Sequence, residues 1–237
     1  MSNVSHPKSD ELRGGLVVAV DGPAGAGKST VAKLCARELG YTYIDTGAMY
    51  RAVGLLARRA LVDFGDSRAL AELVAGLDFE FPWVGQELHT VVAGEDLSVE
   101  IRTPQAAMDA STVSTVSAVR EALVALQRQM GASGGVVMEG RDIGTVVFPK
   151  ADLKIFLTAS PSVRATRRLA QMKERGQQGD MATIIEEIRK RDLQDSTRKI
   201  SPLRPAEDAV ELDSSELGVD TVVAIVGRLA RERGARL

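Results

Sequence analysis

The sequence predicts an α/β fold, a three-layer sandwich in which helices cover both faces of a central five-stranded parallel sheet. Five short apolar segments suit buried strands, and they are Leu16–Val20, Tyr41–Asp45, Val136–Met138, Leu153–Leu157 and Ala209–Leu212. Segments of helical character separate these strands, and such alternation is typical of parallel sheets. A glycine-rich run follows the first strand directly, and ligands of such sheets bind beyond the carboxyl ends of the strands.

Length and composition indicate a globular protein. The chain has 237 residues, of which 44% are hydrophobic and 26% are charged, enough for one sizeable core. The net charge of −2 argues against a broad nucleic-acid surface, and no apolar run reaches the length of a membrane span. The single cysteine, Cys35, fits a reducing compartment and is expected to pack in the core. We therefore expect a cytoplasmic protein that binds small molecules as a monomer.

The chain is expected to form one domain with three internal regions. Residues 1–15 are polar and predict a flexible N-terminal arm, and residues 16–237 form the domain. The first helix is expected to end at Leu39, with Gly40 as its stop. A second helix starts at Thr46, capped by Asp45 or by Thr46 itself, and a later one covers about 118–130.

Residues 76–94 change from helical to alternating periodicity. Phe79, Phe81 and Trp83 alternate on one side of a turn at residues 85 and 86, and apolar residues alternate again after it. This pattern predicts a small antiparallel sheet inserted into the α/β core. We expect its aromatic side chains to form a small core of their own, with a platform for stacking bases as the alternative.

The glycine-rich run has the sequence of a phosphate-binding loop. It consists of Gly22, Pro23, Ala24, Gly25, Ala26, Gly27, Lys28, Ser29 and Thr30. The glycines allow successive backbone N–H groups to surround an anion, and the helix that follows presents its positive end to it. In this pattern Lys28 reaches the β and γ phosphates of a nucleotide, and Ser29 places its hydroxyl on Mg²⁺. The run predicts a P-loop protein that binds ATP.

Two further segments place charged residues at the same edge of the sheet. Glu139 ends the third strand, ahead of Arg141 and Asp142, and its carboxylate is a candidate for holding Mg²⁺ through water. Residues 164–198 form a charged helical region with a glycine-containing tip at 171–180, which is typical of a closing lid. Arg167 and Arg168 lie at its base, from where they are expected to act on the transferring phosphoryl group.

Four motifs together give the chain a family resemblance. They are residues 21–28, residues 45–51, residues 139–149, and Arg191-Asp192 through Asp195 to Arg198. In this order they resemble the signatures of bacterial cytidylate kinases, and the resemblance covers about residues 16–232. It implies a nucleoside monophosphate kinase fold with a lid at about 164–198. The region that binds the acceptor would span about 46–130 and include the inserted sheet.

The resemblance also implies roles for individual residues. Arg51 and Arg141 are similar to the clamp on the acceptor phosphate, and Arg191 and Asp195 to the ribose contacts. The remaining implied acceptor contacts are Thr46, Ser111, Arg120, Asp142 and Arg198. Together with the loop and the charged helical region, this makes Lys28, Arg141, Arg191, Arg167 and Arg168 the candidates for catalysis.

The chemistry of cytosine agrees with these roles. Its pairing edge offers one amino donor and two acceptors. Asp142 and Thr46 suit the amino group, and Arg120 suits N3 and O2. Uracil inverts the donor pattern, so a site built for cytosine would leave buried partners unpaired with uracil. The sequence thus predicts phosphoryl transfer from ATP to CMP and dCMP.

Three alternatives stay open at this stage. The first is another small-acceptor P-loop kinase, acting on UMP, AMP or shikimate. The second is a P-loop switch that hydrolyses GTP slowly, but such switches select guanine through an Asn-Lys-x-Asp element, and the only asparagine here is Asn3. The third is a scaffold without turnover, which leaves the intact phosphate-binding loop unexplained.

Overall fold

A five-stranded parallel sheet forms the centre of the computed structural model, which describes residues 14–85, 87–174 and 176–235. Its strands are β1 (Val17–Asp21), β2 (Thr42–Asp45), β8 (Val136–Gly140), β9 (Leu153–Thr158) and β10 (Val210–Asp213). They lie in the order β10-β9-β1-β8-β2, and each neighbouring pair is parallel. The predicted sheet is confirmed. The expected arm at residues 1–15 falls almost wholly outside the described residues, as does residue 86 of the expected turn.

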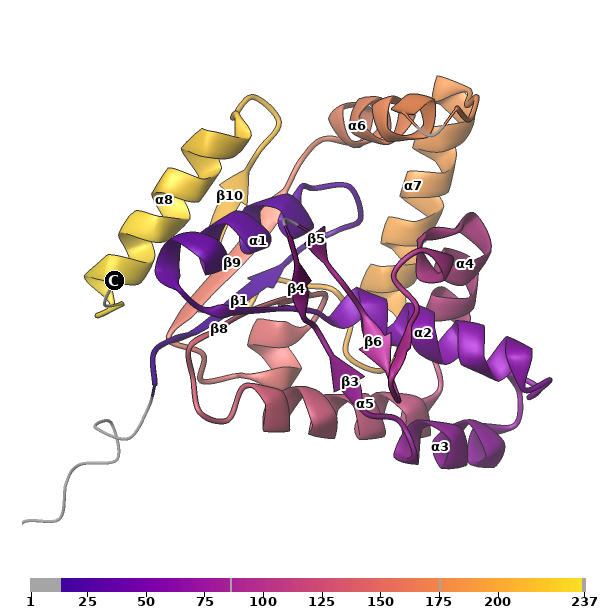
Figure 1. Ribbon diagram of the computed structural model, residues 1–237. Helices are drawn as coiled ribbons and strands as arrows, with labels where there is room; N and C mark the ends of the chain where they lie inside the picture. The colour runs from indigo at the N-terminus through magenta and orange to yellow at the C-terminus, as the bar shows by residue number, and fades with distance from the viewer. Residues whose placement is uncertain (1–13, 86, 175, 236–237) are drawn as a thin grey trace, which may run out of the picture.

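Helices cover both faces of this sheet (Figure 1). Val18 and Val20 of β1 pack in one core cluster with α1 (Lys28–Leu39) and α8 (Val219–Glu232). Val17 and Ala19, which alternate with them, pack on the opposite face with α5 (Ser117–Met130) and the short π-helix η3 (Ile143–Val147). Because successive strand residues point to opposite faces, a continuous apolar strand is buried on both sides. This arrangement brings the loops after β1 and β8 to one edge.

A second helical group lies beside the sheet, next to the carboxyl end of β2. It contains α2 (Thr46–Arg59), α3 (Ser67–Ala75), the 3₁₀-helix η2 (Glu100–Arg102) and α4 (Pro104–Val113). Of the two predicted caps of α2, the structure selects Asp45, whose Oδ1 accepts a hydrogen bond from the Ala48 amide at 2.9 Å. The Thr46 hydroxyl instead donates to the carbonyl oxygen of Glu139 at 2.7 Å. That bond ties the start of α2 to the end of β8.

The inserted strands form two very small antiparallel sheets instead of one. The first contains β3 (Phe79–Glu80), β6 (Val91–Val92) and β7 (Glu95–Asp96), and the second pairs β4 (Trp83–Val84) with β5 (Glu87–Leu88). Phe79 is buried and Phe81 packs against the main core clusters, but Trp83 is 44% exposed. The expected aromatic core is therefore wrong for Trp83, because the chain leaves the first sheet before reaching it.

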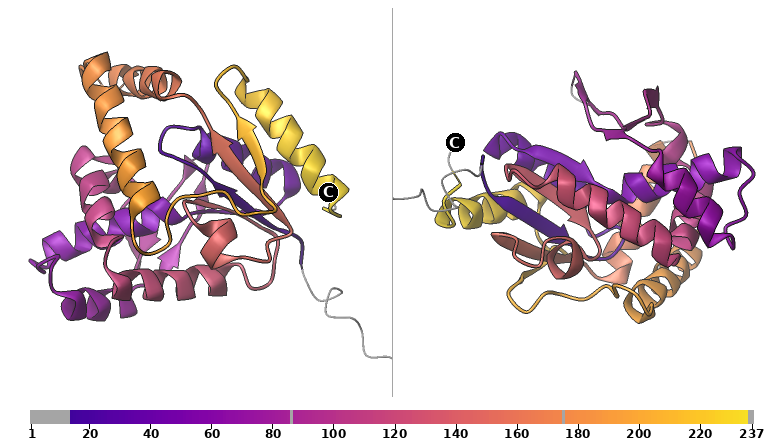
Figure 2. Two further views of the ribbon diagram at one scale, coloured as in Figure 1. Left: turned by 180° about the vertical axis from the view of Figure 1, so that it is seen from behind. Right: turned by 90° about the horizontal axis from the view of Figure 1, so that it is seen from below.

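Two long helices stand over the same edge of the sheet. Figure 2 shows α7 (Met181–Thr197) running alongside α4, and α6 (Pro161–Glu174) packs against the first half of α7. They share a small apolar cluster of their own, formed by Ala165, Ile184 and Ile188. Within the described ranges, no helix has the length and apolar character needed to cross a membrane.

Candidate active site

The loop between β1 and α1 has the backbone geometry that binds an anion. Gly22, Gly25 and Gly27 have φ values of 145°, 79° and 96°, which glycine adopts without strain. A Cβ atom on Gly22 would lie 2.0 Å from the carbonyl oxygen of Leu157, so only glycine fits there. Helix α1 begins at Lys28 with no side-chain cap and no acidic residue in its first turn. Its first amides are thus open to a negatively charged ligand.

This loop lies between two clefts. The first has a volume of about 230 Å³ and extends from the loop toward α2, α4 and α7. The second has a volume of about 610 Å³ and extends along α1 toward α6 and the start of α8. Both are lined by Ala24, Gly25, Lys28, Ser29 and Arg191. Two ligands could therefore meet at the loop, each from its own side.

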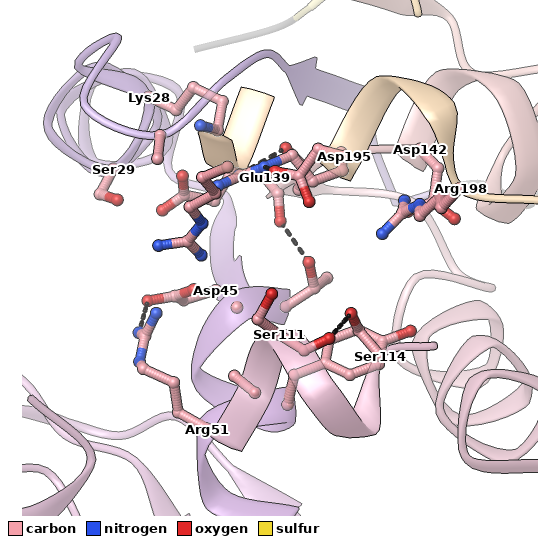
Figure 3. Close-up of a pocket in the computed structure, with 18 of the residues that line it drawn as sticks. Lys28, Ser29, Asp45, Arg51, Ser111, Ser114, Glu139, Asp142, Asp195 and Arg198 are labelled. Atoms are coloured by element: carbon pink, nitrogen blue, oxygen red, sulfur yellow. Dashed lines mark hydrogen bonds and ion pairs between the residues drawn. The ribbon is translucent and has the colours of Figure 1, made fainter. Parts of the chain in front are cut away.

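The first cleft brings together the residues that the sequence singled out for acceptor binding. Its lining includes Thr46, Arg51, Ser111, Arg120, Arg141, Asp142, Arg191, Asp195 and Arg198, together with Lys28, Ser29 and Glu139. Figure 3 shows Lys28 and Ser29 on one side of it, with Arg51 and Ser111 across from them. These side chains come from five separate regions of the sequence, and their contact with a ligand stays a prediction.

Positive charge is concentrated in this cleft and only partly paired. Six basic side chains line it against four acidic ones. Arg51 pairs with Asp45 at 2.9 Å, and the Nε of Arg141 lies 3.0 Å from Asp195 Oδ2. Arg120 pairs with Asp142 where both side chains are buried. Each acidic side chain accepts hydrogen bonds from only some of the N–H groups of its arginine partner. Other N–H groups of these arginines are left without an acceptor.

The leftover donors are buried N–H groups of arginines. Within the part of the chain that the structure describes, four of the six buried side-chain polar atoms without a hydrogen-bond partner belong to the cleft: Nε of Arg51, Arg120 and Arg191, and Nη2 of Arg198. Burial, and after it the nearby charge of Arg141, lower the pKa of Arg191 to about 10. Buried polar groups are nearly always bonded, so this set indicates a site for a ligand with anionic oxygen atoms.

Lys28 and Glu139 face each other across the base of the cleft. Nζ of Lys28 donates to the carbonyl oxygen of Pro23 at 2.8 Å, and burial together with Arg141 lowers its pKa to about 7. Burial raises the pKa of Glu139, as does the nearby charge of Asp45. Glu139 also accepts a hydrogen bond from the hydroxyl of Tyr43. Both charges are held in place but poorly compensated, so each would be stabilised by charged ligands.

The second cleft is lined by Arg167 and Arg168 of α6. Arg167 donates to the carbonyl oxygens of Ala26, at 3.2 Å, and Ser214, at 2.7 Å. Arg168 forms an ion pair of 3.3 Å with Glu187 on the neighbouring helix. Neither lines the first cleft. Their expected action on a transferring phosphoryl group therefore stays a prediction, and it requires that they approach from the side of the second cleft.

Comparisons with known proteins decide the family. The cytidylate kinase family model matches residues 18–232. The chain belongs to the cytidylate kinase family. A protein named cytidylate kinase from Geobacter sp. (strain M21) is 48% identical over 222 residues, which are 94% of this chain and 95% of that protein. Another of that name, from Pelotomaculum thermopropionicum (strain DSM 13744 / JCM 10971 / SI), is 51% identical over 218 residues, covering 91% and 96%.

Some residues that line the first cleft of this cytidylate kinase family member were not predicted from the sequence. Asp45, Tyr50 and Ser114 also line the first cleft. Asp45 and Tyr50 lie in one of the four motifs, so a stricter use of that motif would have found them. Ser114 follows Ser111 by three residues, a spacing that places both on one face of a helix, but no sequence pattern distinguishes it from other surface serines.

Arg164 connects helix α7 to the phosphate-binding loop in this family member. It is 3% exposed and contacts both carboxylate oxygens of Asp192 on α7, at 2.9 and 2.6 Å. It also donates to the carbonyl oxygens of Ala159, at 2.8 Å, and Ala24, at 3.3 Å. Since Asp192 is next to Arg191, this buried arginine holds the part of α7 that lines both clefts.

Replacing Arg164 with lysine is expected to destabilise the protein. Lysine keeps the charge but lacks the planar group that serves Asp192 and two carbonyl oxygens at once. We expect Arg164→Lys to lower the free energy of unfolding by about 2 kcal/mol, measured by urea denaturation. The control is Arg68→Lys, whose side chain is 90% exposed and pairs with Glu72, and which should change it by less than about 0.5 kcal/mol. Equal losses in the two variants would contradict the linking role of Arg164.

Proposed function

We propose that this enzyme transfers the γ-phosphoryl group of ATP to CMP and dCMP, forming CDP and dCDP. Membership of the cytidylate kinase family supports this reaction. The observation that carries the proposal is the first cleft, where unpartnered guanidinium groups surround a space that adjoins the phosphate-binding loop. A phosphate on the acceptor would supply the missing hydrogen-bond acceptors, and the loop would hold the donor phosphates next to it.

We assign the two clefts to the two nucleotides. ATP would place its phosphates in the loop and its base in the second cleft, against α1 and α8. The acceptor would occupy the first cleft. In this assignment residues 46–130 form the region that binds the acceptor, and residues 164–198 form a lid whose helices line both clefts.

Within the first cleft, the acceptor phosphate is assigned to Arg51 and Arg141. Arginine binds phosphate oxygens through two parallel N–H groups, and Arg51 has an unpartnered Nε beside the space. Asp195 would bind a ribose hydroxyl, since its pairing with Arg141 leaves lone pairs available. Arg191, Ser111 and the other lining residues would complete the contacts.

The base is assigned to the end of the cleft formed by Arg120 and Asp142. These two are already paired, so the site presents one acceptor and one donor side by side, the pattern that complements cytosine. The Thr46 hydroxyl donates a hydrogen bond to the backbone carbonyl oxygen of Glu139. The Thr46 oxygen is therefore free to accept a hydrogen bond from the cytosine amino group. Uracil would offer a carbonyl oxygen at that position and leave both acceptors unpaired.

The chemical step requires alignment and positive charge more than proton transfer. The attacking phosphate oxygen of the acceptor is already anionic at neutral pH, so no residue is assigned as a base. Lys28, Arg141 and Arg191 lie around the point where the two clefts meet, and they would stabilise charge on the oxygens of the transferred group. Arg167 and Arg168 would add charge from the lid.

The residues present fit Mg²⁺ bound with the donor phosphates. Magnesium prefers hard oxygen ligands and usually keeps several waters, so few protein ligands are needed. The Ser29 hydroxyl would bind it directly, and the buried carboxylate of Glu139, whose pKa is raised beside Asp45, would hold it through water. When bound, the ion would offset the negative charge of the donor phosphates.

We further propose a cytoplasmic monomer, supported by the single cysteine and the small net charge.

A panel of acceptors tests this function. Purified protein with ATP and Mg²⁺ should phosphorylate CMP and dCMP with kcat/KM at least about a hundredfold above that for UMP, AMP or shikimate. Production of ADP, followed in a coupled assay, measures the rates. A preference for UMP, AMP or shikimate would instead select one of the alternative small-acceptor kinases.

Loss of the loop lysine should nearly abolish turnover. Lys28→Ala removes the cation that reaches the β and γ phosphates, and we expect kcat to fall by roughly a thousandfold. The reduction should be similar for CMP and dCMP, since Lys28 acts on the donor. Full activity in this variant would remove the loop from the mechanism.

Loss of Asp142 should mainly change acceptor preference. Asp142→Ala removes the acceptor assigned to the cytosine amino group and leaves Arg120 without its partner. We expect the ratio of kcat/KM for CMP to that for UMP to fall about tenfold or more, while the KM for ATP changes little. A ratio that is unchanged in the coupled assay would remove Asp142 from base recognition.

A further inference from the structure

A carboxylate outside the cleft supports the loop that carries Asp142. Asp21 is the last residue of β1, directly before Gly22, and is 5% exposed. Its Oδ1 accepts a hydrogen bond from the Ile143 amide at 2.8 Å, and its Oδ2 accepts one from the Gly144 amide at 2.7 Å. Asp21 is absent from the lining of both clefts. It therefore joins the start of the phosphate-binding loop to the segment after β8.

The Gly144 amide is one of the two donors that Asp142 would ordinarily use, the other being the amide of Thr145. Asp142 occupies the N-cap position of the short helix Ile143–Val147, and an aspartate there usually accepts from the amide two or three residues ahead. Asp142 makes no such capping bond. Its carboxylate instead pairs with Arg120 and lies 3.8 Å from Arg198. Asp21 thus occupies one of the two capping donors, the Gly144 amide, together with the neighbouring Ile143 amide.

We propose that Asp21 is a positioning residue for acceptor selection, which binds the Ile143 and Gly144 amides and so keeps the Asp142 carboxylate turned toward Arg120. This inference rests on the proposed function only in that acceptor selection acts through Asp142. Asp21 itself contacts no substrate in this role. It sets which of two hydrogen-bond arrangements the carboxylate of Asp142 adopts.

The charge around Asp21 agrees with this role. Burial raises the pKa of Asp21 to about 6, even though the hydrogen bonds from the two amides act to lower it. Asp142 also raises it, so the two carboxylates are close enough to repel each other. That repulsion disfavours a movement of Asp142 toward the amides that Asp21 holds.

A second way for Asp21 to act would be through Lys28. The charge of Asp21 raises the pKa of Lys28, so removing it would alter the donor side of the reaction. An effect through Lys28 would reduce turnover for every acceptor alike. An effect through Asp142 would change the discrimination between acceptors, and the two can be separated by measuring both.

The experiment compares acceptor discrimination in a double-mutant cycle. We expect Asp21→Ala to lower the ratio of kcat/KM for CMP to that for UMP about tenfold, because Asp142 can then bond the free amides. Asp21→Asn keeps one acceptor oxygen and should give a smaller decrease. In the Asp142→Ala background, Asp21→Ala should change the ratio less than about twofold. The KM for ATP should stay close to that of wild type.

Asp152→Ala serves as the matched control. The Asp152 carboxylate accepts a hydrogen bond from the Val17 amide at 2.7 Å, at the opposite end of the same strand. Its loss likewise removes a carboxylate that binds a backbone amide at one end of β1, yet it should leave the CMP to UMP ratio unchanged. If Asp21→Ala does not fold, as judged by circular dichroism, Asp21→Asn carries the comparison.

Two results would overturn the proposal. One is an Asp21→Ala variant in which kcat/KM falls equally for CMP and UMP. The other is a change in the ratio of kcat/KM for CMP to that for UMP that persists in full in the Asp142→Ala background.

If wild type shows no preference for CMP, the proposed function fails, and a measurement without ligand then tests the role of Asp21. The ¹³C signal of the Asp142 carboxyl should shift in Asp21→Ala, and an unchanged signal would refute the role of Asp21.

Discussion

The concentration of guanidinium groups in one partly buried cleft is the constraint that the rest of the structure serves. Six basic side chains line a space of about 230 Å³, where their mutual repulsion and loss of hydration disfavour the folded state. Acidic partners offset part of this, but buried N–H groups of Arg51, Arg120 and Arg191 stay without acceptors. Substrate phosphates would accept hydrogen bonds from these N–H groups. Substrate binding would then gain the stabilisation that the unpartnered donors lack in the folded protein alone.

Holding these charges in place requires supports that lie outside the cleft. The parallel sheet brings the ends of β1, β2 and β8 to one edge, which places the phosphate-binding loop beside Glu139 and Asp45. Arg164 fixes α7 to that loop through Asp192, and Asp21 fixes the segment after β8. These supporting residues make backbone and carboxylate contacts only, so their effect on substrates is indirect. Helix α7 and the segment after β8 are in this way both held at the carboxyl end of β1.

Much of the fold could be predicted because strands and loops carry local signals. The five core strands lie within two residues of their expected ends, and Gly40 ends α1 with the expected positive φ of 65°. Weakly patterned segments were harder: helices α3 and α4 were not assigned, and the inserted strands divided into two sheets that leave Trp83 exposed. Their pairing depends on packing against α2 and α5, which no local pattern reports.

The sequence by itself determined the phosphate-binding loop, the positions of the five strands and the set of charged residues, because glycine spacing, apolar runs and short motifs depend only on near neighbours in the chain. Only the tertiary structure decided which charges meet. It paired Asp142 with Arg120 instead of its own helix, and it gave the amides of that helix to Asp21, which is more than a hundred residues away. Hydrogen bonds are distributed by competition among all donors and acceptors brought within reach, and that competition exists only once the chain has folded.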